Sequence, residues 1–220
     1  MTDPDFLRTA RAFYDTIAAD YADMARDDLE TKPLDRAMLA AFAELTRSTN
    51  AGPVADLGCG PGRVTAHLHS LGVDAFGVDL SPAMVALARR EHPDLRFEEG
   101  SITRLGLADG SLSGIVAWYS IIHTPPERLP EAFAEFHRVL APGGHLLLAF
   151  QVGDEPLHVD RPFGHPVELD FHRQRPDRIA TLLSEADITT TAQLVRQPDE
   201  TDKGAKVPQG YLLARRPDGA

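Results

Sequence analysis

The stretch Val54-Ala55-Asp56-Leu57-Gly58-Cys59-Gly60-Pro61-Gly62-Arg63 decides the fold of this chain. A short apolar run ends in an acid and turns through three glycines at alternate positions, after which a helix is expected to begin. Glycine lets the backbone turn tightly and lets a ligand approach main-chain atoms without a Cβ in the way. The start of a helix also offers unpaired N–H groups. The stretch therefore predicts a strand, a glycine-rich turn and a helix that together face a ligand.

A second acid follows in the segment Val78-Asp79-Leu80-Ser81, where another short apolar run ends. An acid at the tip of the strand after a glycine-rich turn can accept hydrogen bonds from the hydroxyls of a ribose. The alternative role of Asp79 is structural, as a cap of Ser81 or of the helix that follows. Together the two segments predict a nucleoside-binding crevice at the carboxyl edge of a parallel sheet.

The spacing of the glycines indicates which kind of nucleoside cofactor the crevice could bind. A dinucleotide site has the pattern G-x-G-x-x-G, but here Arg63 stands where the third glycine would fall. A phosphate-binding loop needs G-x-x-x-x-G-K-[ST], and no lysine follows these glycines. Asp56, directly before the glycines, suits a cationic ligand better than a pyrophosphate. The spacing thus disfavours a nicotinamide oxidoreductase of Rossmann type.

These residues resemble the class I S-adenosylmethionine-dependent methyltransferases. The first motif of that family, [DE]-x-G-x-G-x-G, is matched by Asp56, Gly58, Gly60 and Gly62, and its second-strand acid by Asp79. The resemblance implies S-adenosyl-L-methionine as the cofactor and S-adenosyl-L-homocysteine as the product. It implies methyl transfer to O, N or C of a small-molecule acceptor.

Further segments extend the resemblance along most of the chain. Tyr14–Tyr21 is similar to the Y-D-x-x-A-x-x-Y segment of small-molecule members, and Val139–Leu148 to the L-x-P-G-G turn into the fifth strand. Two positions depart from the family pattern, because Ser101 and Gly114 stand where aspartate is usual. These departures keep open a second function, a non-catalytic S-adenosylmethionine-binding regulator or partner protein.

The alternation of apolar strand and helix patterns predicts an α/β fold. The resemblance implies a Rossmann-like, doubly wound, seven-stranded sheet, mostly parallel with an antiparallel C-terminal hairpin strand. We expect a single methyltransferase domain over 1–220, with a helical lid at about 1–48 and an irregular insert or lid at about 151–174. Strands are predicted near 53–57, 74–79, 95–98, 113–119, 144–150, 188–196 and 208–215, and helices over 62–71, 82–91, 127–140 and 175–185.

The residues expected to contact the cofactor lie on the N-terminal helix and at the ends of the first four strands. Trp118 could equally be a core residue, and Cys59 is expected to be a small buried side chain rather than a nucleophile. The full set is Tyr14, Tyr21, Asp56, Gly58, Cys59, Gly60, Asp79, Leu80, Met84, Ser101, Ile102, Trp118, Tyr119 and Ser120.

His123 is the candidate catalytic residue, because it follows the fourth strand near the place where the methyl group is expected. A neutral imidazole there could accept a proton from the acceptor, although a structural histidine would look the same in sequence. The insert is expected to contact substrate through His165, Glu168, Asp170 and His172. No metal is expected, because no pair of these histidines has the spacing of a metal site.

The composition limits the partners. The 220 residues include 33 acids against 22 bases, a net charge of −11, which argues against nucleic acid or an anionic membrane as partner. The acidic start lacks the profile of a signal peptide, and no apolar run has the length of a membrane span. The single cysteine allows no intrachain disulfide. A cytoplasmic protein, monomer or homodimer, is expected.

Overall fold

The computed structural model describes residues 4–49, 52–200, 202 and 206–219. Within these ranges two long helices, α1 and α2, precede the first strand. The α-helices are α1 (Asp5–Ala25), α2 (Pro33–Arg47), α3 (Arg63–Ser70), α4 (Pro82–Glu91), α5 (Leu129–Val139) and α6 (Pro176–Glu185). Three short 3-10 helices are η1 (Ile121–His123), η2 (Pro126–Arg128) and η3 (Pro162–Gly164).

The main sheet has seven strands in the order β3-β2-β1-β4-β5-β9-β8. Its strands are β1 (Val54–Leu57), β2 (Ala75–Asp79), β3 (Phe97–Glu99), β4 (Leu112–Trp118), β5 (Leu140–Gln151), β8 (Thr189–Arg196) and β9 (Gln209–Arg215). β9 runs antiparallel between β5 and β8. The other strand pairs of this sheet, β2–β3, β1–β2, β1–β4 and β4–β5, are parallel. The predicted fold class is confirmed.

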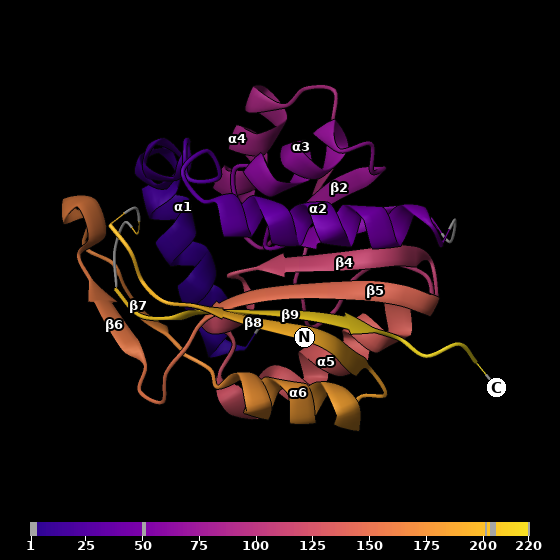
Figure 1. Cartoon of the computed structure of the whole chain (residues 1–220). Helices are drawn as coiled ribbons and strands as arrows, with labels where there is room; N and C mark the ends of the chain where they lie inside the picture. Colours follow the sequence, from indigo (N-terminus) through magenta and orange to yellow (C-terminus); the bar gives the residue numbers. More distant parts are fainter. Residues whose placement is uncertain (1–3, 50–51, 201, 203–205, 220) are drawn as a thin grey trace.

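Helices cover both faces of this sheet (Figure 1). α2, α3 and α4 lie on one face and α5 and α6 on the other, while α1 lies beyond the end of the sheet to which β4 points. Every residue of β1 and β4 is buried, as expected for parallel strands covered on both sides. The strand order reverses between β1 and β4, and in an open α/β sheet ligands bind outside the carboxyl ends of the strands at that point.

Local sequence signals account for the helix that follows β2. Ser81 is the N-cap of α4, and its Oγ accepts a hydrogen bond from the Met84 N–H at 3.2 Å. Pro82 stands at the first helical position, where its missing N–H costs no hydrogen bond. α4 ends at Glu91, so the predicted bounds 82–91 are confirmed.

The structure corrects two sequence-based expectations. β5 begins at Leu140 rather than near residue 144, because Leu140 already pairs with Leu112 directly after α5 ends. The insert at 151–174, expected to be irregular, contains the antiparallel hairpin of β6 (Leu157–Asp160) and β7 (Glu168–Phe171). Each of these short strands alternates apolar and polar residues, which is the pattern of a strand with one buried face.

That alternation decides what the hairpin covers. Val159, Leu169 and Phe171 pack on Phe13 and Ile17 of α1, so the apolar face of the hairpin lies against this helix.

Among the described residues, no helix has the length and the apolar character that a membrane span requires.

Candidate functional site

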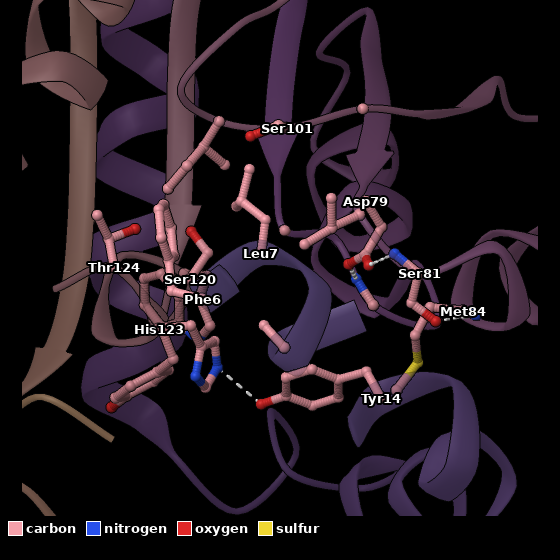
Figure 2. A pocket seen from close by; sticks show the side chains of 18 of the residues that line it. Phe6, Leu7, Tyr14, Asp79, Ser81, Met84, Ser101, Ser120, His123 and Thr124 are labelled. Carbon is pink, nitrogen blue, oxygen red and sulfur yellow. Dashed lines mark hydrogen bonds between the residues drawn. The ribbon is translucent and has the colours of Figure 1, made fainter. Parts of the chain in front are cut away.

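A cavity of about 730 Å³, counting the space at its mouth, lies at the carboxyl ends of β1, β2 and β4, with α1 as its opposite wall. Figure 2 shows Asp79 and His123 on opposite sides of it. Its lining is Phe6, Leu7, Ala10, Tyr14, Tyr21, Gly58, Gly60, Asp79, Leu80, Ser81, Met84, Gly100, Ser101, Ile102, Trp118, Tyr119, Ser120, His123 and Thr124. The lining thus includes all the predicted cofactor contacts except Asp56 and Cys59.

Asp79 ties the glycine turn to the next helix. One carboxylate oxygen accepts a hydrogen bond from the Gly60 N–H at 2.7 Å, and the other accepts from the Ser81 N–H at 2.8 Å. Burial raises the pKa of Asp79 to about 6, although these two hydrogen bonds act in the opposite direction. Each carboxylate oxygen retains a further lone pair, so the group can still accept from a ligand.

Gly58 shows why the turn needs glycine. Its φ is 74°, in the left-handed region, and a Cβ there would lie 2.3 Å from the Cβ of Ser120. The backbone of the turn therefore packs directly on Ser120, two residues after the end of β4. This close approach brings the ends of β1 and β4 together at the floor of the cavity.

Asp56 lies behind the turn rather than in the cavity. Its side chain is 0% exposed, Oδ2 accepts a hydrogen bond from the Thr65 hydroxyl at 2.7 Å, and Oδ1 has no partner among the described residues. Burial raises the pKa of Asp56 to about 7, more than the Thr65 hydrogen bond lowers it. Asp56 therefore lies beneath the turn and outside the cavity lining, and its contact with the cofactor stays a prediction.

The buried carboxyl of Asp56 predicts a pH-dependent stability. A carboxyl whose pKa is higher in the folded state binds more protons there, so the contribution of Asp56 to stability is greatest at low pH and falls as pH rises from about 3.8 to about 7. The shift from 3.8 to about 7 corresponds to at most about 4 kcal/mol. We expect Asp56→Asn to lose less stability than the wild type between pH 5 and pH 8, measured by urea unfolding at both values. An equal decline in both proteins would show that another group titrates.

Cys59 points away from the cavity. Its side chain is 6% exposed and packs with Val85, Ala88 and Phe97 between the sheet and α4. Burial raises the pKa of its thiol. The expectation of a small buried cysteine is confirmed. Cys59 is not in the cavity lining, and its contact with the cofactor stays a prediction.

Three polar side chains of α1 form hydrogen bonds at the edge of the cavity. The Tyr14 hydroxyl lies 2.7 Å from His123 Nε2 (Figure 2). Asp15 accepts hydrogen bonds from the Ser81 hydroxyl at 2.5 Å and the Ala83 N–H at 3.1 Å, at the N-terminus of α4. The Arg11 Nε donates to the Leu80 carbonyl at 3.2 Å. The N-terminal helix is therefore bonded to residues on both sides of the cavity.

His123 is neutral in this setting. Burial and the neighbouring His172 lower the pKa of His123 to about 3, so the imidazole carries no charge at neutral pH. Its Nδ1 is buried and has no hydrogen-bond partner among the described residues, and the same is true of Trp118 Nε1 and Ser120 Oγ. Buried polar groups in native structures almost always have partners, so three orphans in one wall indicate a place for a ligand.

Comparison with known proteins identifies the fold family. Residues 54–144 match the family described as Methyltransferase domain. These residues form a class I methyltransferase domain. The demethylmenaquinone methyltransferase of Beutenbergia cavernae is 34% identical over 138 residues, which are 60% of this chain and 57% of that protein. The trans-aconitate 2-methyltransferase of Escherichia coli O7:K1 is 42% identical over 112 residues, 48% of this chain and 42% of that protein.

Solved structures share the whole fold. The magnesium protoporphyrin IX methyltransferase of Synechocystis PCC 6803 superposes with a TM-score of 0.70 at 17% identity, covering 98% of this chain and 99% of that chain. The chain spans about half the length of the curated relatives that it matches in sequence.

The structure explains one departure of this methyltransferase domain from its family pattern. A Cβ at Gly114 would lie 2.6 Å from Thr46 Cγ2 and 2.8 Å from Phe42 Cζ, both on α2. The glycine in place of the usual aspartate therefore lets α2 pack closely on β4. Gly114 is not in the cavity lining, so its departure does not alter the cavity wall.

The four predicted substrate contacts lie outside this cavity. His165 is bonded to Asp20 on α1 at 2.8 Å, and Asp170 to His158 at 2.8 Å on the exposed face of the hairpin. Glu168 is exposed on the same face, and His172 follows the hairpin. For Glu168 and Asp170 the reason is the register of β6 and β7, which turns the apolar face of the hairpin toward α1. No three His, Cys, Asp or Glu side chains gather as a metal site in the part of the chain that the structure describes.

The lining contains residues that the sequence did not single out for the site. Phe6, Leu7 and Ala10 of α1 form an apolar wall, and Gly100 and Thr124 complete the rim. The signal for the first three was the amphipathic spacing of the helix, which indicates a buried face but not what that face covers.

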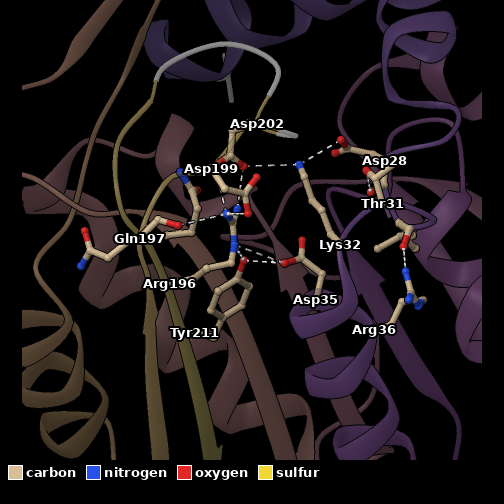
Figure 3. A network of polar contacts seen from close by, with 12 residues as sticks. Asp28, Thr31, Lys32, Asp35, Arg36, Arg196, Gln197, Asp199, Asp202 and Tyr211 are labelled. Carbon is tan, nitrogen blue, oxygen red and sulfur yellow. Dashed lines mark hydrogen bonds and ion pairs between the residues drawn. The ribbon is translucent and has the colours of Figure 1, made fainter.

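A buried polar network around Arg196 and Tyr211 (Figure 3) reaches Tyr119 through the Tyr211 hydroxyl. Arg196 is 7% exposed and donates to both carboxylate oxygens of Asp202, at 2.9 and 2.6 Å. The Tyr211 hydroxyl donates to Asp35 at 2.7 Å and lies 3.3 Å from the Tyr119 hydroxyl. The network thus joins α2, β8 and β9 to a residue of the cavity wall, which fixes the side chain of Tyr119.

Proposed function

We propose that this chain transfers the methyl group of S-adenosyl-L-methionine to a small-molecule acceptor and releases S-adenosyl-L-homocysteine. The observation that carries the proposal is the Asp79 carboxylate beside the Gly58–Gly62 turn, both in the wall of one cavity. Two relatives have names that state methyl transfer to demethylmenaquinone and to trans-aconitate, which supports the same reaction type here.

The residues of the wall fit this cofactor. Asp79 would accept hydrogen bonds from the ribose hydroxyls, and the Ser101 hydroxyl from the adenine amine. Gly58 and Gly60 would face the amino-acid end with their backbone, which no Cβ obstructs. The ring of Trp118 would lie near the sulfonium, and a cation near an aromatic face gains about 0.5–2 kcal/mol. When bound, the cofactor supplies an electrophilic methyl group.

The chain itself would orient the reactants and exclude water. α1, bonded through Tyr14, Asp15 and Arg11, would cover the cavity and hold the reacting groups apart from solvent. An acceptor that is protonated at working pH, such as a phenol, also needs a base. We assign this role to His123 with its proton on Nε2, donated to the Tyr14 hydroxyl oxygen. In that tautomer Nδ1 carries the free lone pair.

A turnover assay tests the proposal. We expect S-adenosyl-L-homocysteine to form from S-adenosyl-L-methionine in the presence of a panel of phenols, amines and carbon acids, and NADH not to compete. Cofactor binding without turnover on any acceptor would favour the regulator. Competition by NADH would favour an oxidoreductase site.

Several sequence-based expectations stay predictions. They are the single domain over 1–220, the lids at about 1–48 and 151–174, a cytoplasmic location, a monomer or homodimer, and the absence of a nucleic-acid partner. The contacts of substrate with His165, Glu168, Asp170 and His172 also stay predictions, and the lining of the cavity lends them no support.

A further inference from the structure

A second groove lies between the chain that enters α6 and the chain that leaves β5. It has a volume of about 400 Å³, counting the space at its mouth, and it shares no lining residue with the cavity around Asp79. Its walls come from Pro126 and from residues of the segments 153–156 and 172–178. The His172 N–H donates to the Ile122 carbonyl at 2.8 Å. The groove therefore lies beside the segment that carries His123, but outside the cavity.

Positive charge is concentrated in this groove, although the whole chain has a net charge of −11. Arg173, Arg175 and Arg178 line it, and Asp154 is the acid of the same wall. Asp154 forms an ion pair with Arg175 at 3.1 Å. The guanidinium groups of Arg173 and Arg178 form no hydrogen bond or ion pair with the described residues. Two positive charges of the wall are therefore available to a ligand.

Packing orients the side chain of Arg173 without neutralising its charge. A Cβ at Gly153 would lie 2.9 Å from Arg173 Cδ, so the aliphatic part of the arginine packs on the backbone of Gly153. The Nε atom of Arg173 is buried and has no hydrogen-bond partner among the described residues. A guanidinium group forms its strongest contacts with carboxylate or phosphate, often through two parallel hydrogen bonds. Arg173 is therefore positioned for an oxyanion that the protein itself does not provide.

Two uncharged features of the same wall also point to a ligand. Gln174 lines the groove and is 1% exposed, and its Oε1 has no hydrogen-bond partner among the described residues. Buried polar groups almost always have partners, and a ligand hydroxyl could donate to this oxygen. No side chain caps the N-terminus of α6, where the N–H groups of the first turn favour an anion. Asp177, the acid of that turn, is exposed and is not in the lining.

We propose that this groove binds a small molecule that carries a phosphate group and a hydroxyl. A phosphate monoester has a charge of about −1.5 to −2 at pH 7, which matches the two unpaired guanidinium groups. A carboxylate has a single negative charge and would leave one of them unpaired. The hydroxyl would donate to Gln174 Oε1. The site lies outside the cofactor cavity, so the inference does not rest on the proposed methyl transfer.

The test uses glycerol 3-phosphate and glycerate, because both carry hydroxyls and they differ in the charged group. Each is titrated at neutral pH and constant ionic strength into the full chain labelled with nitrogen-15, and NMR follows the Nε–H signals of Arg173 and Arg178. We expect both signals to shift saturably at millimolar glycerol 3-phosphate, with an affinity at least about five-fold higher than for glycerate. Absence of a saturable shift in either signal would overturn the site. A smaller preference, or a preference for glycerate, would overturn the assignment of phosphate.

A matched pair of variants separates the groove from the overall charge. Arg178→Gln and Arg90→Gln each remove one positive charge from an exposed side chain. Arg178 lines the groove, whereas Arg90 lies on α4, on the other face of the sheet (Figure 1). With the Arg173 signal as the readout, we expect Arg178→Gln to weaken glycerol 3-phosphate binding at least about five-fold and Arg90→Gln no more than about two-fold. Equal losses in the two variants, or unchanged affinity in Arg178→Gln, would overturn the inference.

Discussion

Replacing His123 by alanine is expected to slow methyl transfer by about 10²–10⁴-fold, the usual contribution of a positioned general base. The reason is its place in the cavity wall, with Nε2 bonded to the Tyr14 hydroxyl and Nδ1 unpaired. Affinity for S-adenosyl-L-homocysteine should stay within a few-fold, because the proposed cofactor contacts lie around Asp79. The measurement is kcat on the best acceptor of the panel, with calorimetry of the product alongside.

The control for this variant is Tyr14→Phe. It removes the hydroxyl that orients the imidazole but keeps the ring that contacts His123 and Met84, so kcat should fall less than in His123→Ala. Because the pKa of His123 is lowered to about 3, wild-type kcat should show no loss from its protonation between pH 9 and pH 5. Unchanged kcat in His123→Ala over this range would make the histidine structural.

Asp79→Ala is expected to weaken the binding of S-adenosyl-L-homocysteine by roughly 1–3 kcal/mol, about 5- to 150-fold. Two losses add up here. The ribose hydroxyls lose their acceptor, and the Gly60 and Ser81 N–H groups lose the carboxylate that fixes the turn. Calorimetry of the variant beside the wild type measures the difference.

Asp15→Asn is the matched control for Asp79→Ala. Asp15 lies close by and bonds Ser81 and Ala83, but its side chain is not in the lining, and asparagine keeps an acceptor oxygen. Its affinity for S-adenosyl-L-homocysteine should change by no more than about two-fold. Unchanged affinity in Asp79→Ala would remove the ribose assignment.

Much of the fold could be predicted because its signals are local. The Gly58–Gly62 turn and Pro82 each act on neighbouring residues, and the spacing between strands sets the crossovers. The lining confirms that most of the predicted cofactor residues share one cavity.

The rest of the site depends on contacts between distant segments. His123 meets Tyr14 across 109 positions of sequence, and no local pattern indicates which helix face closes a crevice. For the same reason Glu168 and Asp170 were predicted to face substrate, although the register of their strand turns them outward. A shift of one residue in a strand exchanges its two faces, so side-chain direction in the insert could not be read from composition.

The most direct measurement is a calorimetric titration of the full chain with S-adenosyl-L-homocysteine. This ligand contains the adenosine and amino-acid ends that the wall around Asp79 and Ser101 is proposed to bind, and it does not react. The account predicts saturable binding at one site, weakened as stated in Asp79→Ala. Absence of binding at millimolar ligand would contradict it, because a cavity that cannot hold the product of methyl transfer cannot be the site of that reaction.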